Sequence, residues 1–361
     1  MSVIELQTVN FRNLNSEKLS FHPKLNYITG DNGSGKSSLL ESLFYLGHGK
    51  SFRTSHIDSL ICTNTDSFIV SVKIENNIQL GIQRNIQGES NIKINGAKHT
   101  KLSDLAKNFA IQIVTPESFK LFVGGPKERR KFVDLGMFHV KHSFSALWQD
   151  FSRTLKQRNA CLKKRVSASQ LTYWTEEFCR LSELIAALRN EYIVTLREEV
   201  TFWLSIVLPS LKEEIHIRYS QGWANKKELR DVLDMNLAKE YERGFSLFGA
   251  QKFDIKFLID NLSIEHRLSR GQQKLFLLAL TFAQTSLIAK VNRLKPILLI
   301  DDIGAELDHS SRTAMFSAIQ ALECQTMITA IDSVALEPLI PVNNNYKMFH
   351  VKHGQISAMS K

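Results

Sequence analysis

The segment Leu25–Ser37 reads LNYITGDNGSGKS, and it decides how the rest of the sequence is interpreted. Its first five residues form a short run of β-prone, largely apolar side chains, which predicts a strand. The next eight residues fit the pattern G-x-x-x-x-G-K-[ST], and an apolar helix pattern follows them as far as Leu46. A strand, a glycine-rich loop and a helix in this order predict a loop that binds phosphate.

Each residue type in this loop has a physical role. The glycines permit backbone angles that turn successive N–H groups inward around a phosphate. Lys36 supplies a mobile positive charge for the β- and γ-phosphates, and the hydroxyl of Ser37 can ligate Mg²⁺. The alternative, a chance match, is disfavoured by the flanking strand and helix. The predicted nucleotide-binding residues are Gly30, Asp31, Asn32, Gly33, Ser34, Gly35, Lys36, Ser37 and Ser38.

A second motif, Pro296–Asp302, reads PILLIDD. Four aliphatic residues predict a buried strand, and the two carboxylates lie at its carboxyl end, where sites form in α/β sheets. We interpret Asp301 as the metal-side carboxylate and Asp302 as the residue that faces the attacking water as base or positioner. The alternative is an ordinary core strand that ends in a polar turn.

A third motif, Leu268–Lys274, reads LSRGQQK and precedes an apolar helix predicted to extend to about Val291. Ser269 is a good N-cap residue, and Gly271 leaves backbone N–H groups accessible. These features predict a second anion site at a helix N-terminus, although a capped helix with no ligand would read in the same way. The turn Ala305–Asp308, with sequence AELD, follows the acidic strand closely.

The composition describes a globular protein with a basic balance. The chain has 361 residues, which at roughly 150 residues per domain indicates about two domains. Hydrophobic residues make up 43% and charged residues 23%, which excludes disordered, collagen-like and low-complexity classes. Lys and Arg number 46 against 36 acids, a net charge of +10. This balance favours a polyanionic partner, either nucleic acid or an anionic membrane surface, unless the charge is spread evenly.

Targeting and redox signals are absent from the sequence. The longest apolar run, Leu275–Ala283, is far shorter than the roughly 20 residues of a membrane span. The first residues show no basic start followed by an apolar stretch, so no secretory signal is visible. The four cysteines are widely spaced without a C-x-x-C pair, which predicts free thiols rather than a zinc site. We therefore expect a cytoplasmic protein that does not enter a membrane.

The hydrophobic periodicity changes twice along the chain. Alternating runs and the Asn95–Gly96 turn predict strands in the first hundred residues. Residues 143–208 lack Pro and Gly and follow a helical period, with Arg158 falling unexplained on the apolar side. The last hundred residues return to an α/β pattern. We predict an α/β head from residues 1–104 and 241–361, and a mostly helical lobe with a short arm from 105–240.

Taken together, the loop, the Leu268–Lys274 motif and the acidic strand resemble ABC-type ATPase heads. About 230 residues separate Ser37 from Leu268, and so long an insertion resembles the SMC-like branch of DNA-repair ATPases. More specifically, the chain resembles the RecF family of bacterial recombinational-repair ATPases. The segments that carry this resemblance, besides the motifs above, are Val9–Leu14, Gly49–Arg53, Thr115–Glu117, Gly125–Asp134, Leu155–Asn159 and Lys347–Phe349.

The resemblance implies a fold and a mechanism. The fold would be an ABC-type P-loop ATPase head with an N-terminal antiparallel β subdomain and an inserted helical lobe. ATP and Mg²⁺ would be the cofactors, with Lys36 and Asp302 catalytic and with Ser37 and Asp301 on the metal side. In a head-to-tail homodimer, the signature residues of one subunit cap the nucleotide of the other. Those residues correspond to Ser269, Arg270, Gly271 and Gln272.

The family also implies a role in recombinational gap repair. ATP binding would close the homodimer on DNA and hydrolysis would release it, with weak DNA-dependent ATPase activity. RecO and RecR would be partners in loading RecA on gapped DNA. Two basic clusters, Arg129–Lys131 and Lys163–Arg165, are candidate contacts to DNA phosphates, at a duplex or a duplex–single-strand junction. Solvated helix faces would explain the same clusters.

The sequence departs from the family at three places. Gly249–Asp254 reads GAQKFD where the family usually has Gly-Pro-His-Arg before the aspartate. Asp302 stands where ABC enzymes generally have glutamate, and Thr329–Asp332 contains no switch histidine. The first departure removes the His and Arg that would make a phosphate or dimer contact in the family, and the other two predict weak turnover. Two other functions stay open at this point, an ATPase subunit coupled to a membrane transporter and a non-catalytic, ATP-gated DNA scaffold.

Overall fold

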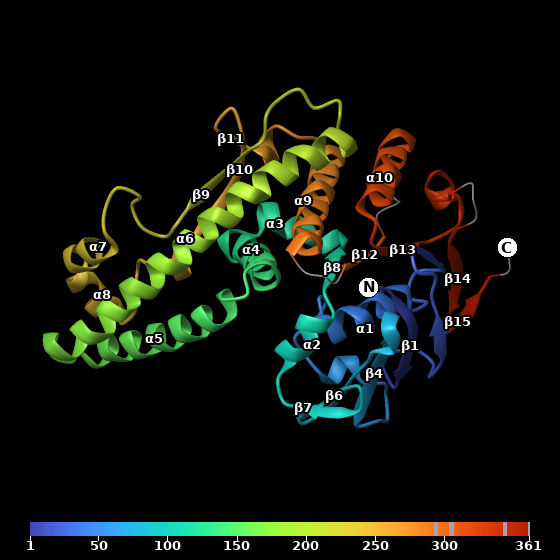
Figure 1. The fold of residues 1–361 in the computed structure, drawn as a ribbon, viewed down its shortest axis with the longest axis horizontal. Coiled ribbons are helices and arrows are strands. Elements are labelled where there is room, and N and C mark those ends of the chain that lie inside the picture. The colour runs from blue at the N-terminus through green and yellow to red at the C-terminus, as the bar shows by residue number, and fades with distance from the viewer. Residues whose placement is uncertain (292–294, 303–306, 342–344, 360–361) are drawn as a thin grey trace. The chain divides into compact units, whose positions relative to one another are not determined.

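The computed structural model describes residues 1–291, 295–302, 307–341 and 345–359, and the chain divides into two compact units (Figure 1). Unit 1 contains residues 1–118, 202–209 and 270–361, and unit 2 contains residues 119–201 and 210–269. These boundaries differ from the predicted division at 105 and 240. The physical reason is strand pairing, because Ile111–Val114 pairs with a strand of unit 1 and Asp254–Ile259 pairs with a strand of unit 2.

The centre of unit 1 is a six-stranded mixed sheet with the order β15-β14-β3-β13-β12-β8. Every pairing is parallel except that of the β14–β15 hairpin. The residues of β3, β12 and β13 are all buried, as expected for central strands of a covered parallel sheet. The strands are β3 (Leu25–Thr29), β8 (Ile111–Val114), β12 (Ile297–Ile300), β13 (Gln325–Ala330), β14 (Lys347–Lys352) and β15 (Gln355–Ala358).

The second sheet of unit 1 is antiparallel, with the order β2-β1-β4-β5-β6-β7. In β4 every second side chain from Phe68 onward is buried, which is the alternation of a sheet with one face on the core. Asn95 and Gly96 both have positive φ and close the β6–β7 hairpin as predicted. The strands are β1 (Val3–Val9), β2 (Lys18–Ser20), β4 (Ser67–Ile74), β5 (Gln79–Asn85), β6 (Ser90–Ile94) and β7 (Ala97–His99).

Helix α1 (Lys36–His48) contacts strands of both sheets and lies in their shared core (Figure 1). Eleven of its 13 residues are buried, so the helix is covered on all sides rather than on one stripe. Phe11, Tyr45 and Phe68 form edge-to-face aromatic pairs that join β4 and the chain after β1 to this helix. This packing therefore fixes the position of α1, the helix that follows the phosphate loop.

The described part of unit 1 also contains α2 (Leu102–Asn108), α9 (Arg270–Val291) and α10 (His309–Leu322). Helix α9 is long and apolar enough to cross a membrane, but 78% of its apolar 18-residue segment is buried inside the protein. Its Phe282 packs edge-to-face with Trp203, and the helix also contacts β8 and α10. Helix α9 is therefore explained as a core helix.

Unit 2 is mostly helical and also contains a small antiparallel sheet, β11-β10-β9. Helices α5 and α6 follow each other through a tight turn at Arg165, and α6 continues into unit 1. The helices are α3 (Lys120–Val123), α4 (Pro126–Val140), α5 (Phe144–Lys164), α6 (Ala168–Val207), α7 (Leu229–Met235) and α8 (Leu237–Arg243). The strands are β9 (His216–Ser220), β10 (Asp254–Ile259) and β11 (Leu262–Ser263).

The position of Arg158 on the apolar side of α5 has a structural explanation. Its guanidinium is fully buried and donates to Glu240 Oε2 at 2.7 Å, to Ser246 Oγ at 2.6 Å and to Thr175 Oγ1 at 3.2 Å. Glu240 is fully buried too, and its Oε1 accepts from the backbone N–H of Leu247 at 2.7 Å. A buried charge is tolerated when it is paired and hydrogen-bonded in this way.

His139 on α4 gives unit 2 a predicted pH dependence. Burial lowers its pKa from 6.5 to about 4, because desolvation disfavours the charged imidazolium. Between pH 6.5 and pH 4 the unfolded chain binds this proton and the folded chain does not. The stability held at pH 7 is therefore lost as the pH falls through this window, by about 2 kcal/mol at pH 5.

Thermal unfolding between pH 7 and pH 5 measures this effect. We expect His139→Gln to flatten the pH dependence of unfolding relative to the wild type. His142→Gln, at an exposed position on the following loop, should leave it unchanged. Equal pH dependence in the wild type and in His139→Gln would contradict the prediction.

Candidate nucleotide-binding site

The phosphate loop lies at the carboxyl edge of the mixed sheet, between the end of β3 at Thr29 and the start of α1 at Lys36. Gly30, Gly33 and Gly35 all have positive φ angles, of 149°, 78° and 121°. A Cβ atom at Gly30 would lie 2.3 Å from the carbonyl oxygen of Val351 on β14, so no larger residue fits there without a backbone shift. The predicted order of strand, loop and helix is therefore the observed one.

The side chain of Lys36 is buried within the loop that it follows. Its Nζ donates to the carbonyl oxygen of Gly30 and, at 2.9 Å, to that of Asp31. Burial lowers the pKa of Lys36, while the carboxylates of Asp302, Asp301 and Asp31 oppose this shift. A desolvated ammonium group at a loop of this geometry is suited to an anionic ligand.

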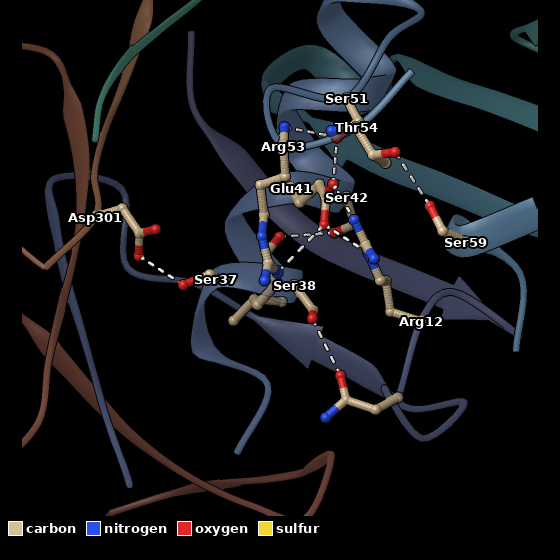
Figure 2. A network of polar contacts seen from close by, with 12 residues as sticks. Arg12, Ser37, Ser38, Glu41, Ser42, Ser51, Arg53, Thr54, Ser59 and Asp301 are labelled. Carbon is tan, nitrogen blue, oxygen red and sulfur yellow. Dashed lines mark hydrogen bonds and ion pairs between the residues drawn. The ribbon is translucent and has the colours of Figure 1, made fainter. Parts of the chain in front are cut away.

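Asp301 joins three separate segments at the end of β12. Its Oδ1 accepts hydrogen bonds from Ser37 Oγ at 3.0 Å and from Thr329 Oγ1 at 2.7 Å; Figure 2 shows the bond to Ser37. Burial raises the pKa of Asp301, the bonds from Thr329 and Ser37 oppose the rise, and the charge of Asp302 adds to it. The first serine of α1 and the first aspartate of the acidic strand, 264 residues apart, are thus in direct contact.

Asp302 follows with a φ of 50°, in the left-handed region that Asp and Asn tolerate better than most residues. Its backbone N–H donates to Thr329 Oγ1 at 2.9 Å, so one threonine hydroxyl links both aspartates of the motif to β13. Thr329 was not among the predicted site residues. The sequence signal for it is a hydroxyl at the end of the neighbouring buried strand.

These groups line a cavity of about 600 Å³ within unit 1, a size that suits a small-molecule ligand. One side of it consists of the loop, the start of α1 and the two aspartates. Another side consists of residues 59–63, which are joined to residues 10–12 by backbone hydrogen bonds. The lining residues are Arg12, Asn13, Asn32, Gly33, Gly35, Lys36, Ser37, Ser38, Arg53, Ser59, Ile61, Cys62, Thr63, Asp301 and Asp302.

The cavity contains side chains that were not predicted as site residues. Asn13 accepts from Ser38 Oγ at 3.0 Å, and its Nδ2 donates to the loop carbonyls of Gly33 and Ser34, both at 3.4 Å. Two arginines, Arg12 and Arg53, also line the cavity. Both lie in segments that carried the family resemblance, but no local pattern separates them from surface arginines.

The predicted signature residues are not among those that line the described cavity. Ser269 is the last residue of unit 2, and Arg270 begins helix α9 of unit 1. In the predicted turn at 305–308, the first two residues lie outside the described part of the chain. Asp308 caps α10, and its side chain accepts from Ser311 N at 2.7 Å.

The two basic clusters differ in their surroundings. Arg129 forms a two-point ion pair with Asp254, at 2.9 and 3.0 Å, and Arg130 donates to the carbonyl oxygen of Phe253. Lys131 pairs with Glu128 at 2.8 Å. The contacts of Arg129 and Arg130 join α4 to the start of β10, which gives these two arginines a structural role. The second cluster, Lys163–Arg165, is exposed at the α5–α6 turn.

Comparisons with known proteins match nearly the whole chain to one family. The family model described as RecF/RecN/SMC N terminal domain matches residues 2–357. A curated relative from Colwellia psychrerythraea, described as DNA replication and repair protein RecF, is 56% identical, and the match covers 99% of this chain and 97% of the relative. A relative of the same description from Pseudoalteromonas translucida is 40% identical, with 99% of both chains covered.

The chain belongs to the RecF family. Solved structures agree: one described as the recombination mediator protein RecF with ATP in the RecFOR pathway has a TM-score of 0.86 at 25% identity. The match covers 99% of this chain and 98% of that one. An SMC head bound to a domain of ScpA has a TM-score of 0.56 at 18% identity, which supports the fold alone. The fold is thus the predicted α/β ATPase head with an antiparallel subdomain and a helical lobe, and the protein is a DNA replication and repair ATPase of the RecF family rather than a transporter subunit.

The buried carboxylate of Asp301 leads to a prediction about stability. We expect Asp301→Asn to raise the thermal stability of the protein without nucleotide, because the buried charge is removed while an acceptor for Ser37 and Thr329 remains. The same variant should lose most of the stabilisation that ATP with Mg²⁺ gives the wild type.

Thermal unfolding with and without ATP and Mg²⁺ measures both effects. Asp66→Asn, at an exposed position on the loop before β4, is the matched control and should behave as the wild type. An Asp301→Asn variant that retains the full Mg²⁺-dependent shift would contradict the assignment of Asp301 to the metal side.

Proposed function

We propose that the protein binds ATP with Mg²⁺ in the described cavity and hydrolyses it slowly to control a DNA-bound dimer. The observation that carries this proposal is the hydrogen bond from Ser37 to Asp301, which joins the phosphate loop to the acidic strand at the wall of the cavity. It places a serine hydroxyl, a carboxylate and the ammonium of Lys36 around one space. These are the groups that phosphoryl transfer requires in P-loop enzymes.

The donor chemistry fits a magnesium ion. Ser37 Oγ and Asp301 Oδ1 are oxygen ligands 3.0 Å apart, and Mg²⁺ is usually held by one or two such groups together with substrate phosphates. Among the residues that the structure describes, no three His, Cys, Asp or Glu side chains converge on a metal site of their own. Bound Mg²⁺ would neutralise charge on the β- and γ-phosphates. Lys36 would supply the second positive charge there.

Asp302 is the proposed catalytic carboxylate that positions the attacking water. It lines the same cavity, and its backbone is held by Thr329. An aspartate is one methylene shorter than the glutamate usual in ABC enzymes, and Thr329–Asp332 supplies no switch histidine. Both features support slow turnover, which suits a molecular switch better than a motor.

The signature residues Ser269–Gln272 are proposed to act on the nucleotide of a second copy. They precede and begin α9, whose first N–H groups are suited to an anionic phosphate. ATP binding would then close a head-to-tail homodimer on DNA, and hydrolysis would open it. In this way ATP binding and dimerisation of the two copies would be coupled.

DNA phosphates, RecO and RecR are the proposed partners of the dimer. The net charge of +10 and the exposed Lys163–Arg165 cluster support phosphate contacts at duplex DNA or a duplex–single-strand junction. The structural relative named for the RecFOR pathway supports RecO and RecR as partners. Assistance in loading RecA is the role that the family resemblance implies for them. The corresponding location is the cytoplasm, in association with the nucleoid.

Replacing Lys36 tests the central part of the proposal. In sedimentation experiments, ATP with Mg²⁺ should shift the wild type from monomer to dimer and raise its affinity for DNA. Lys36→Ala should lose at least tenfold in ATP affinity and fail to dimerise, because a desolvated positive charge at the phosphates is removed. Lys50→Ala, at an exposed position two residues after α1, is the control. An unchanged wild-type mass at saturating ATP would count against the proposal.

Replacing Ser269 tests the action between copies. Ser269→Arg should leave ATP binding by the monomer within about twofold of the wild type, because residue 269 does not line the cavity of its own chain. It should block ATP-dependent dimerisation by placing a bulky cation in the interface. Equilibrium binding of a fluorescent ATP analogue and sedimentation separate the two effects. Normal dimerisation of this variant would exclude the proposed cap.

A further inference from the structure

A second buried acid, Glu41, lies behind the nucleotide site on α1. Its side chain is 0% exposed, and it sits five residues after Lys36 on the same helix. A buried carboxylate in the core of a protein is costly unless it is paired and fully hydrogen-bonded. Its partners therefore show what the carboxylate holds in place.

Arg12 is the first partner. Its Nε and Nη2 donate to Glu41 Oε2 and Oε1, both at 2.8 Å, in the two-point geometry that fixes the plane and direction of a guanidinium (Figure 2). The backbone of Arg12 has a φ of 55°, and its N–H donates to the carbonyl oxygen of Leu60. Backbone and side chain are thus both constrained at a residue that lines the cavity.

The turn after α1 provides the other partners. Ser51 Oγ donates to Glu41 Oε1 and accepts from the backbone N–H groups of Arg53 at 2.8 Å and Thr54 at 3.0 Å. Arg53 Nη1 lies 3.7 Å from Glu41 Oε2. Figure 2 shows these side chains converging on the carboxylate. One acid therefore orients two arginines from segments about 40 residues apart in the sequence.

The exposed fractions of the three side chains indicate which of them can reach a ligand. Arg12 and Arg53 are 19% and 45% exposed and line the cavity, whereas Glu41 is buried and does not. The cluster has two positive charges and one negative charge, so it presents a net positive charge toward the space that also contains Lys36. A planar guanidinium held in one direction is well suited to phosphate oxygens.

We propose that Glu41 is a positioning residue of the ATP site, which holds Arg12 and Arg53 toward the phosphates without itself touching the nucleotide. This inference rests on the proposed function. The proposal predicts that loss of Glu41 affects ATP turnover but not ATP affinity. The phosphate loop alone suffices for ATP binding, while the correct placement of the arginines is needed for turnover, because catalysis depends on small displacements of charged groups.

Glu41→Gln tests the inference with a side chain of equal size. We expect kcat for ATP hydrolysis to fall at least tenfold while the affinity for a fluorescent ATP analogue changes less than threefold, as for loss of an interaction made in the transition state. The matched control is Glu240→Gln, which disrupts the fully buried Arg158–Glu240 pair of unit 2. It should lower thermal stability but leave kcat per folded molecule within twofold of the wild type.

A coupling experiment distinguishes positioning from a general loss of stability. If Glu41 acts through the arginines, then Glu41→Gln should change kcat by less than twofold in a background that already contains Arg12→Ala and Arg53→Ala. A purely structural role would give the same fold-loss in both backgrounds and would overturn the inference. So would a kcat per folded molecule that is unchanged in the single variant.

Ser51→Ala keeps the inference testable if the Glu41 variant does not fold. Ser51 is only half-buried and connects Glu41 to the turn that contains Arg53. We expect this variant and Arg53→Ala each to lower kcat at least threefold with near-normal ATP affinity. If both keep kcat within twofold, the inference fails. A wild type that neither binds nor hydrolyses ATP would instead refute the proposed function, so this measurement comes first.

Discussion

One carboxylate oxygen connects the parts of the candidate site. Oδ1 of Asp301 accepts hydrogen bonds from Ser37 on α1 and from Thr329 on β13, while Asp301 itself directly follows β12. This arrangement requires β3, β13 and β12 to lie side by side and parallel, so that their carboxyl ends meet at one edge. The sheet order is therefore the constraint on which the site depends, because it brings together residues 264 positions apart.

Burial at this edge of the sheet disfavours both the negative charge of Asp301 and the positive charge of Lys36. Burial raises the pKa of Asp301 and lowers that of Lys36, so the folded protein opposes the charged form of each. A phosphate would relieve the desolvated ammonium, and a cation would relieve the desolvated carboxylate. The site thus gives up some stability of the free protein in favour of ligand binding, which is a common trade in functional sites. The carboxylate of Glu41, by contrast, is buried outside the cavity lining and is already paired with Arg12, which lines the cavity.

Local sequence patterns were sufficient for the elements that form the site. The strands at 25–29 and 297–300 have the predicted bounds, because a short apolar run next to a glycine-rich or acidic turn is a local signal. The phosphate loop was likewise visible from residue types and spacing. The strand at 111–114 and the pairing of residues 254–259 were missed, because short strands are defined by partners distant in sequence. The compact units consequently divide at other residues than the predicted 105 and 240.

Side-chain pairs between distant segments could not be read from the sequence at all. Arg158 lies on the apolar side of α5, and its partner Glu240 is 82 residues further along the chain. The sequence around Arg12 likewise does not indicate its ion pair with Glu41. The residues next to an acidic or basic side chain do not indicate which distant residue it pairs with. The conformation of a glycine-rich loop, in contrast, depends on residues within the loop itself. Sequence reasoning therefore identified the groups at the proposed nucleotide site but not those that support them.

The most direct test is a structure of the protein with a non-hydrolysable ATP analogue and Mg²⁺. We predict that Ser37 Oγ ligates the metal next to Asp301, and that residues 269–272 of a second copy reach the γ-phosphate beside Lys36. A nucleotide bound outside the described cavity, or a complex in which residues 268–274 point away from every γ-phosphate, would contradict this account.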